Sequence, residues 1–244
     1  MSTDINSIKE KFERIKLCVF DMAGTTVNED NLVYKTVRDA INQVLSDEDK
    51  TAQEVDLDIC LAFGAGKEKR QAINDILNEL NIAGDKVESL TDTAFTIFKT
   101  RLSKAYTAET LAPFEGMLEL FDQLKATGRK VILNTGYDAT TANNILAILG
   151  WSVGNEIDAL VTADDVTNGR PAPDMIMLAM DKFGVKDTQQ VLKAGDSGID
   201  IEEGKNANCG LCIGVLSGAQ TRAQLETSSP DIALDKLTDL AQLL

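Results

Sequence analysis

The alternation of short apolar runs with amphipathic segments is the feature that most constrains the fold of this 244-residue chain. Five apolar runs have strand length and are followed by turn residues, and a sixth is weaker: 16–20, 130–134, 158–162, 190–195, 210–215 and 231–234. Three helical patterns between them end at glycines: 116–128, 140–150 and 173–184. This alternation predicts an α/β fold with a doubly wound parallel sheet, whose site lies beyond the carboxyl ends of the strands.

One long segment, residues 28–112, interrupts this alternation. Its apolar residues recur at helical spacing in three stretches and form no convincing strand: 33–45, 73–80 and 87–106. We expect an all-helical cap (lid) domain here, inserted after the first strand and packed over the carboxyl edge of the sheet. Residues 1–27 and 113–244 would then form the catalytic core, with 111–116 as the returning hinge.

The composition excludes several classes of function. A formal net charge of −15 disfavours nucleic-acid binding through phosphate contacts. The chain contains no histidine, so triads and metal sites that need imidazole are excluded, and a metal would be a hard cation held by oxygen ligands. Two of the four cysteines form one C-x-x-C pair, "CGLC" at 209–212, but without a second pair or a histidine a zinc site is not expected. No segment resembles a signal peptide or reaches membrane-spanning length. We expect a reduced, cytoplasmic protein without a membrane partner.

Polar residues follow four of the predicted strands. Asp21, Thr135 and Asp196 stand at the ends of the first, second and fourth runs, and Arg170 comes just after the third. Each residue alone has an ordinary explanation as a helix cap, a turn residue or a surface charge. Together they predict one crevice that contains two carboxylates, a hydroxyl and a guanidinium, because parallel strands open their loops on the same edge.

Four ordered motifs carry a resemblance to a known family. They are "DMAGTTV" from Asp21, "NTGY" from Asn134, "VTADDVTNGRPAPDM" from Val161 and "AGDSGIDIEEG" from Ala194. With them the chain resembles the haloacid dehalogenase (HAD) superfamily of hydrolases, which have a Rossmann-like core. Ala23 and Arg170 make it most similar to the branch of phosphonoacetaldehyde hydrolases (phosphonatases).

The resemblance implies a set of roles for the core motifs. Asp21 would attack phosphorus and form an aspartyl-phosphate, and Mg²⁺ would be the cofactor. Thr135, Gly136 and Arg170 would hold the phosphoryl oxygens, with Tyr137 beside them. The metal ligands would be Asp21, the backbone carbonyl of Ala23, Asp196 and Asp200. Phosphonatases pair through their lids, so the resemblance also implies a homodimer.

Ala23 stands where phosphatases of the superfamily place the aspartate that protonates an ester oxygen as it leaves. Such general acid catalysis is typically worth about 10²- to 10⁴-fold in rate, so alkyl phosphates should be poor substrates. Cleavage of a C–P bond has a different requirement, namely an electron sink. A lysine that forms an imine with an aldehyde β to phosphorus supplies that sink, and no proton from a residue at position 23 is needed.

The cap contains a candidate for this lysine in "FGAGKEKRQAI", residues 63–73. Lys67 fits the G-x-x-K spacing of the phosphonatase lid motif, and Arg70 stands where phosphonatases place a histidine. Phe63 and Met22 replace a methionine and a tryptophan of that branch. Lys67 has three interpretations: an imine-forming residue, an anchor for a substrate anion or an exposed helix charge. Arg70 is a candidate substrate-binding residue.

The sequence leaves three functional classes open. The first is hydrolysis of the C–P bond of phosphonoacetaldehyde or a related small phosphonate. The second is a phosphatase, such as one acting on phosphoglycolate, or a mutase that acts on a small phosphorylated metabolite and uses Lys67 as an anion anchor. The third, a sensor that binds a phosphorylated metabolite without turnover, is disfavoured because the acidic and basic motif residues are all present.

Overall fold

The structure is a computed structural model that describes residues 5–48, 54–80 and 86–244. Its main strands occupy the six predicted runs: β1 (Leu17–Phe20), β4 (Lys130–Thr135), β5 (Ala159–Thr162), β6 (Val191–Gly195), β7 (Leu211–Val215) and β8 (Ile232–Leu234). They form one parallel sheet in the order β5-β4-β1-β6-β7-β8. The predicted α/β fold with a parallel sheet is confirmed. β1 lies in the interior of the sheet, so the end of the first run reaches the middle of the carboxyl edge.

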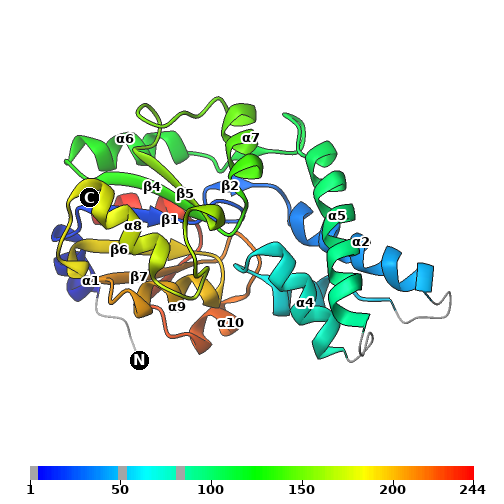
Figure 1. Ribbon diagram of the computed structural model, residues 1–244. Coiled ribbons are helices and arrows are strands. Elements are labelled where there is room, and N and C mark those ends of the chain that lie inside the picture. The colour runs from blue at the N-terminus through cyan, green and yellow to red at the C-terminus, as the bar shows by residue number, and fades with distance from the viewer. Residues whose placement is uncertain (1–4, 49–53, 81–85) are drawn as a thin grey trace.

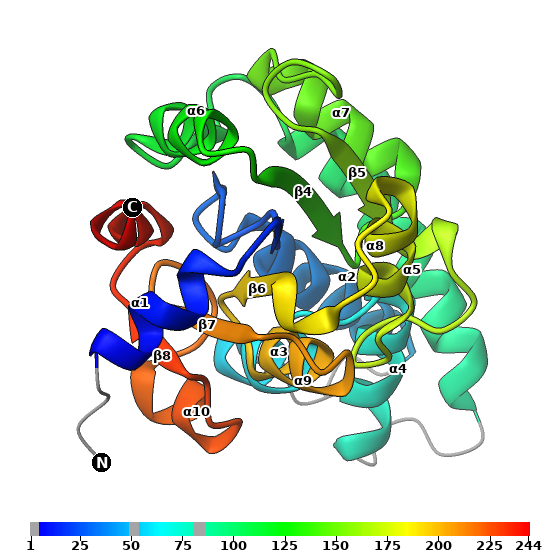
Figure 2. The same ribbon diagram turned by 90° about the vertical axis from the view of Figure 1, so that its left-hand side faces the viewer.

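Helices cover both faces of the sheet (Figures 1 and 2): α1 (Ile5–Glu13), α6 (Met117–Ala126), α7 (Ala139–Leu149), α8 (Asp174–Phe183), α9 (Gly198–Asn206) and α10 (Arg222–Thr227). Alternate residues of β1 belong to separate apolar clusters, because successive side chains of a strand point to opposite faces. Leu17 and Val19 share a cluster with residues of α8, whereas Cys18 and Phe20 pack with residues of α1, α6 and α7. As predicted, α7 and α8 end before the left-handed glycines Gly150 and Gly184.

Four cap helices lie beyond the carboxyl edge of the sheet, at the right of Figure 1: α2 (Leu32–Glu48), α3 (Leu57–Gly64), α4 (Lys69–Glu79) and α5 (Val87–Ala105). Three of them match the predicted helical stretches. The short helix α3 was not anticipated from the sequence. Where the chain crosses between core and cap, β2 (Val27–Asn28) pairs with β3 (Ala112–Pro113) in a two-stranded antiparallel ladder. The division at residues 27/28 and 112/113 stays a prediction, and this ladder is located at both crossings.

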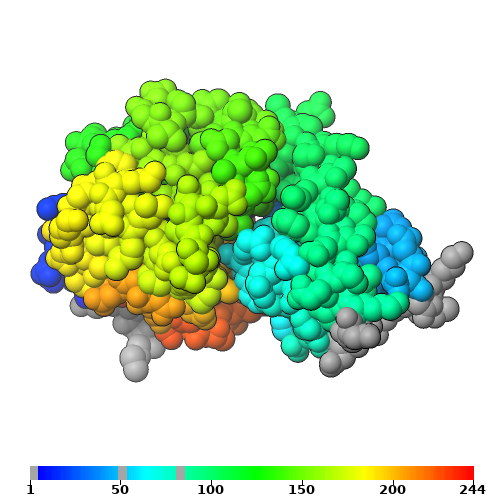
Figure 3. All heavy atoms as spheres, viewed as in Figure 1, coloured from blue at the N-terminus to red at the C-terminus, as the bar shows by residue number. Residues whose placement is uncertain are grey.

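The cap lies directly against the core (Figure 3). Two glycines make the close approach possible. A Cβ at Gly66 of the cap would lie 2.3 Å from Oγ of Ser197, and one at Gly136 of the core would lie 2.8 Å from the carbonyl oxygen of Lys67. Real Cβ atoms do not approach other heavy atoms so closely, so a larger residue at either position would force a neighbouring group to shift, and at Gly136 that group is the backbone of the cap loop. Within the described ranges, no helix has the length and apolar content to span a membrane.

The aromatic contact between α6 and the sheet gives a test of the core. Phe121 is fully buried and lies with its ring centroid 6.2 Å from that of Phe20 and 5.4 Å from that of Trp151. We expect Phe121→Ala to lower the free energy of unfolding by about 3–5 kcal/mol, because it removes the packed ring and leaves a cavity. Urea denaturation followed by circular dichroism measures this loss. Leu118→Ala on the same helix, at a side chain 40% exposed, is the matched control and should cost less than about 1 kcal/mol. Equal losses in the two variants would contradict this account of the core.

Candidate active site

Asp21 follows directly after β1, and the backbone around it is tightly held. Its amide donates to the carbonyl of Ala194 on β6 (3.0 Å), and its own carbonyl accepts from the hydroxyl of Thr26 (2.9 Å). The carbonyl of Met22 accepts from the amides of three residues that follow it in the turn, Thr25, Thr26 and Val27. Asp21 is 6% exposed. Its carboxylate is thus held in place on a rigid turn at the carboxyl edge of the sheet.

Arg170 lies against this carboxylate. Its Nη1 atom is 2.7 Å from Oδ1 of Asp21 and 2.9 Å from Oδ1 of Asp200, and its Nη2 donates to Asn134. Burial alone would lower the pKa of this guanidinium, but the charges of Asp200, Glu203 and Asp21 raise the pKa above its ordinary value. The structure therefore brings Arg170 and Asp21 together, as the order of the motifs predicted.

The sequence analysis missed three buried members of this cluster, Lys193, Glu203 and Asn134. Lys193 on β6 is fully buried, and its Nζ lies 3.0 Å from both Asp200 and Glu203 and 2.6 Å from Oδ1 of Asn134. Asn134 also donates to Glu203 (2.8 Å). A lysine inside the apolar run "VLKAG" was the available signal, because a buried strand lysine requires acidic partners.

Asp21, Asp196 and Asp200 form a group that fits a metal ion, because each can place one carboxylate oxygen within 4.8 Å of those of the other two. Burial would raise the pKa of Asp200, but Arg170 and Lys193 bring it below its ordinary value. For Asp196, burial and then the charges of Asp21 and Asp200 raise the pKa well above the ordinary value. Its oxygens accept from the amide of Ala219 (2.6 Å) and the hydroxyl of Thr25 (3.4 Å), and the hydrogen bonds from the amides of Ala219 and of Asp196 itself act to lower this pKa.

The carboxylate of Asp200 is compensated by basic neighbours and that of Asp196 is not, and this difference favours a bound cation. The described ion pairs of Arg170 and Lys193 go to Asp21, Asp200 and Glu203 and not to Asp196. A hard divalent ion between the three carboxylates would relieve the repulsion that Asp196 experiences. Burial also raises the pKa of Asp21, whereas the neighbouring guanidinium of Arg170 favours its carboxylate form. The role of the Ala23 carbonyl as a further ligand stays a prediction.

The loop after β4 lies between this cluster and the cap. Thr135 is buried, and its Oγ1 accepts from the amide of Tyr137 (3.2 Å). Gly136 faces the backbone of Lys67 in the cap loop. Tyr137 is 3% exposed and its hydroxyl is hydrogen-bonded to that of Tyr106 (2.7 Å). The predicted phosphate-binding loop is therefore also the surface on which the cap rests.

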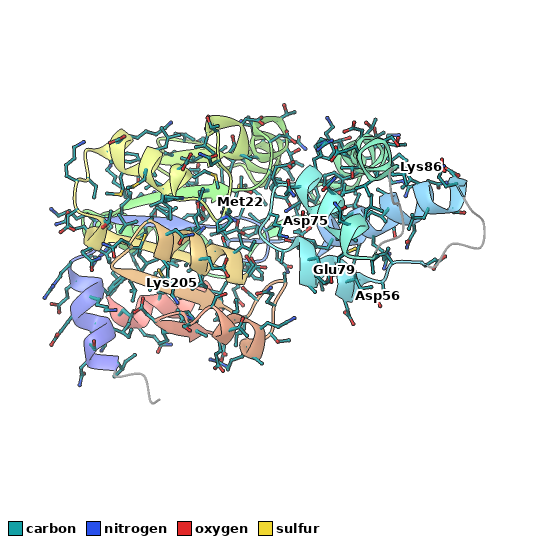
Figure 4. The ribbon with its side chains drawn as sticks, turned by 60° about the horizontal axis from the view of Figure 1, so that its bottom comes forward. Met22, Asp56, Asp75, Glu79, Lys86 and Lys205 are labelled. Carbon is teal, nitrogen blue, oxygen red and sulfur yellow. The ribbon has the colours of Figure 1, made fainter. Side chains whose placement is uncertain are left out.

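The side chains of the two cap candidates do not join the core cluster. The Nζ atom of Lys67 pairs with Oδ2 of Asp75 (2.5 Å), which Figure 4 labels on α4 of the cap. Arg70 pairs with Glu88 (2.8 Å) and Asp92 (2.7 Å) at the cap surface. The proposed roles of Lys67 and Arg70 stay predictions, and the structure places both side chains in ion pairs within the cap.

A buried carboxyl group stands where the chain enters the cap. Oε2 of Glu29 accepts from the amide of Val33 (2.7 Å) and from the hydroxyl of Tyr106 (3.1 Å). The hydroxyl of Tyr106 is also hydrogen-bonded to that of Tyr137. Through these hydrogen bonds Glu29 is linked to the loop after β4. Burial raises the pKa of Glu29 to about 7, although these hydrogen bonds and nearby Lys69 act in the opposite direction.

A parallel sheet with a buried aspartate on the turn after β1, an acidic cluster that could hold a metal ion and helices beyond the carboxyl edge agree with one class of hydrolase. The family model of haloacid dehalogenase-like hydrolases matches residues 15–208, and the chain belongs to this family. It is a hydrolase.

Particular relatives differ in the substrates that their names state. The chain is 36% identical over 118 residues to a phosphonoacetaldehyde hydrolase of Latilactobacillus sakei, a match that covers 48% of this chain and 43% of that protein. It is 25% identical over 231 residues to pyrophosphatase PpaX of Bacillus mycoides, covering 95% of this chain and 97% of that one. A phosphonoacetaldehyde hydrolase-like protein of Oleispira antarctica shares the fold with a TM-score of 0.74 at 23% identity, covering 94% and 91% of the two chains. The match to the first relative thus spans less than half of that protein's length.

Glu29 predicts a pH dependence of stability. Because its folded-state pKa is raised, its contribution is fully present below pH 4.5 and is lost as the pH rises through 7. Glu29→Gln keeps an oxygen for Val33 and Tyr106 but does not titrate. We expect the free energy of unfolding of Glu29→Gln to rise relative to the parent by up to about 3 kcal/mol between pH 4.5 and 8. Urea titrations of both proteins across this range measure the difference, and a difference independent of pH would refute the assignment.

Proposed function

We propose that this protein is a Mg²⁺-dependent hydrolase that forms an aspartyl-phosphate on Asp21 and cleaves the C–P bond of phosphonoacetaldehyde or a related small phosphonate. The observation that carries the proposal is the ion pair between the Asp21 carboxylate and Arg170. In the turn that follows Asp21, position 23 is an alanine and not the aspartate that would act as a general acid. Such a site has a nucleophile and a positive charge for the phosphoryl group. It lacks the residue that would protonate an alkoxide.

The chain's residues divide the work of phosphoryl transfer. Asp21 attacks phosphorus with its carboxylate, and Arg170 turns one of its donors from Asp21 toward the phosphoryl oxygens as negative charge develops. The Thr135 hydroxyl and the Gly136 amide hold the remaining oxygens. Mg²⁺ held by Asp21, Asp196, Asp200 and the Ala23 carbonyl would neutralise the charge that otherwise repels nucleophile and substrate. The electrons of the broken C–P bond would pass into an imine that a cap lysine, for which the motif offers Lys67, forms with the aldehyde. The resulting enamine takes a proton on carbon and water releases acetaldehyde, while a second water hydrolyses the aspartyl-phosphate.

A second function is favoured by a specific observation. The similarity to a pyrophosphatase extends over 95% of this chain, whereas the phosphonoacetaldehyde hydrolase match covers 48%. A phosphate is a better leaving group than an alkoxide, so hydrolysis of an anhydride is compatible with Ala23. A phosphatase or mutase that acts on an alkyl ester, in contrast, would need an acid from the cap.

The first test is the release of acetaldehyde and phosphate from phosphonoacetaldehyde. We expect both products in equal amounts with Mg²⁺ and neither after chelation with EDTA. Asp21→Asn should reduce release to the uncatalysed rate, because the amide is no nucleophile. Thermal denaturation of this variant is the control for folding. Phosphate release from pyrophosphate but not from phosphonoacetaldehyde would support the second function instead.

Ala23→Asp tests whether the missing general acid at position 23 is what limits the hydrolysis of alkyl phosphates. A carboxylic acid at this position should raise the hydrolysis of alkyl phosphates such as phosphoglycolate by about 10²-fold or more over the parent. Ala23→Asn, which has similar volume and no proton to give, is the matched control. If Ala23→Asn raised the rate as much, the effect would not be general acid catalysis.

A further inference from the structure

The loop after β7 takes no part in the proposed mechanism, although it lies beside the acidic cluster. Residues 216–220, which we call the β7 loop, are half-buried and lead toward α10, a helix that Figure 1 labels near β7. Gly195 on β6 pairs with Gly214 on β7 in parallel register, so the segments after both strands leave the sheet at the same edge. The segment after β6 begins with Asp196. The β7 loop is therefore in a position to act on this carboxylate.

The β7 loop holds one oxygen of Asp196. The amide of Ala219 donates to Oδ2 of Asp196 (2.6 Å). A Cβ at Gly218 would lie 2.0 Å from this oxygen, and one at Gly24, in the turn after Asp21, would lie 2.4 Å from it. Cβ atoms do not approach other heavy atoms so closely, so the glycines at both positions make room for the carboxylate. Oδ2 is thus hydrogen-bonded to an amide and lies against two glycines.

The second oxygen of this carboxylate is held less firmly. Oδ1 of Asp196 accepts from the hydroxyl of Thr25 over 3.4 Å, which exceeds the usual distance of about 2.5–3.0 Å for such a bond. Asp196 is 4% exposed, so bulk water does not make up the difference. The two oxygens therefore differ, because the protein binds Oδ2 firmly and leaves Oδ1 available for a cation.

The other two carboxylates of the cluster are restricted in a similar way. Oδ1 of Asp21 lies 2.7 Å from Nη1 of Arg170. Oδ1 of Asp200 lies 2.9 Å from the same nitrogen and 3.0 Å from Nζ of Lys193, and its Oδ2 accepts from the hydroxyl of Ser197 (2.5 Å). Each carboxylate thus has at least one oxygen engaged by the protein. Such a cluster suits a cation that takes one oxygen from each ligand.

The β7 loop is itself attached on both sides of the cluster. The hydroxyl of Ser217 donates to the carbonyl of Gly24 (2.7 Å), in the turn that follows Asp21. The side chain of Gln220 accepts from the amide of Gly198 (2.7 Å), the first residue of α9. The loop therefore connects the turn that carries the nucleophile to the helix that carries the last acidic motif.

We propose that the β7 loop makes Asp196 a metal ligand through Oδ1 alone, and thereby shifts the preference of the site from Ca²⁺ toward Mg²⁺. The inference rests on the proposed function for the presence of a metal, and on the contacts of Oδ2 for the role of the loop. Mg²⁺ demands a compact octahedron, whereas Ca²⁺ takes about six to eight oxygens and often both oxygens of one carboxylate. Ser217, Gly218 and Ala219 are positioning residues, because they act on the cation through Asp196 and Gly24.

The first test compares Mg²⁺ and Ca²⁺ binding by isothermal titration calorimetry, with MgCl₂ or CaCl₂ added to the full chain after removal of metal with EDTA and dialysis. Gly218→Ala places a Cβ against Oδ2 and displaces Asp196. We expect its Kd for Mg²⁺ to rise by about 10- to 100-fold, as is typical when a group that orients a metal ligand is lost. The Kd for Ca²⁺ should rise less, because a displaced Asp196 can turn both oxygens to the larger ion. An unchanged Kd for Mg²⁺, or an equal rise for both ions, would overturn the inference.

The hydroxyl of Ser217 gives a milder pair of variants. Ser217→Ala removes the hydrogen bond to Gly24, and we expect its Kd for Mg²⁺ to rise by about 3- to 10-fold. Ser217→Thr, which keeps a hydroxyl, is the matched control and should bind Mg²⁺ like the parent. Thermal denaturation in EDTA shows whether each variant is folded. A parent-like Kd in folded Ser217→Ala would overturn the role of the loop even if Gly218→Ala did not fold.

The wild-type protein separates this inference from the proposed function. If it bound no Mg²⁺ and released no product from phosphonoacetaldehyde or pyrophosphate in the presence of Mg²⁺, the proposed metal-dependent function would fail. If it bound Mg²⁺ and the variants at Ser217 and Gly218 bound the ion equally well, only the inference about the β7 loop would fail.

Discussion

Two buried cations, Lys193 and Arg170, hold the acidic side chains of the site in place. Lys193 and Arg170 lie between Asp200, Glu203 and Asn134, and Arg170 reaches from there to Asp21. Removing one partner of a buried ion pair typically costs about 3–5 kcal/mol, because the remaining charge stays desolvated. β1, β6 and α9, as well as the loop that carries Arg170, are therefore tied to a common arrangement of charges. That arrangement leaves Asp196 as the carboxylate with the least compensation.

The position of the cap on the core depends on close backbone contacts. Gly66 and Gly136 allow the two backbones to approach, and the ladder of β2 and β3 holds both crossings side by side. Tyr34, Tyr106 and Tyr137 come from the cap and from the core, and they surround Glu29 and Lys69 at the boundary. The burial of Lys69 is thus a consequence of how the cap packs on the loop after β4.

Much of the fold followed from periodicity alone. Apolar runs flanked by turn residues matched all six strands of the main sheet, because strands buried on both faces have continuous apolar sequences. The two-residue strands β2 and β3 were not predicted. The helix α3 escaped notice because eight residues are too few to show a clear 3.6-residue period. Of the candidate site, Asp21, Thr135, Arg170 and Asp196 could be placed from their positions after strands. The sequence did not predict the other three members of the cluster, Lys193, Glu203 and Asn134. Their role depends on contacts with one another and with Asp200, which only the folded chain brings together.

The sequence by itself determined the parallel sheet, the helical cap and the acidic edge at which Asp21 and Asp196 meet, since hydrophobic period and strand order bring the ends of parallel strands together. Only the tertiary structure decided which cations neutralise which carboxylates, and that Lys67 turns to Asp75 while Lys69 is buried against Tyr34 and Tyr137. The physical reason is that side chains two residues apart at the start of a helix point in different directions. Whether one of them meets solvent or the active site depends on segments that lie far away along the chain.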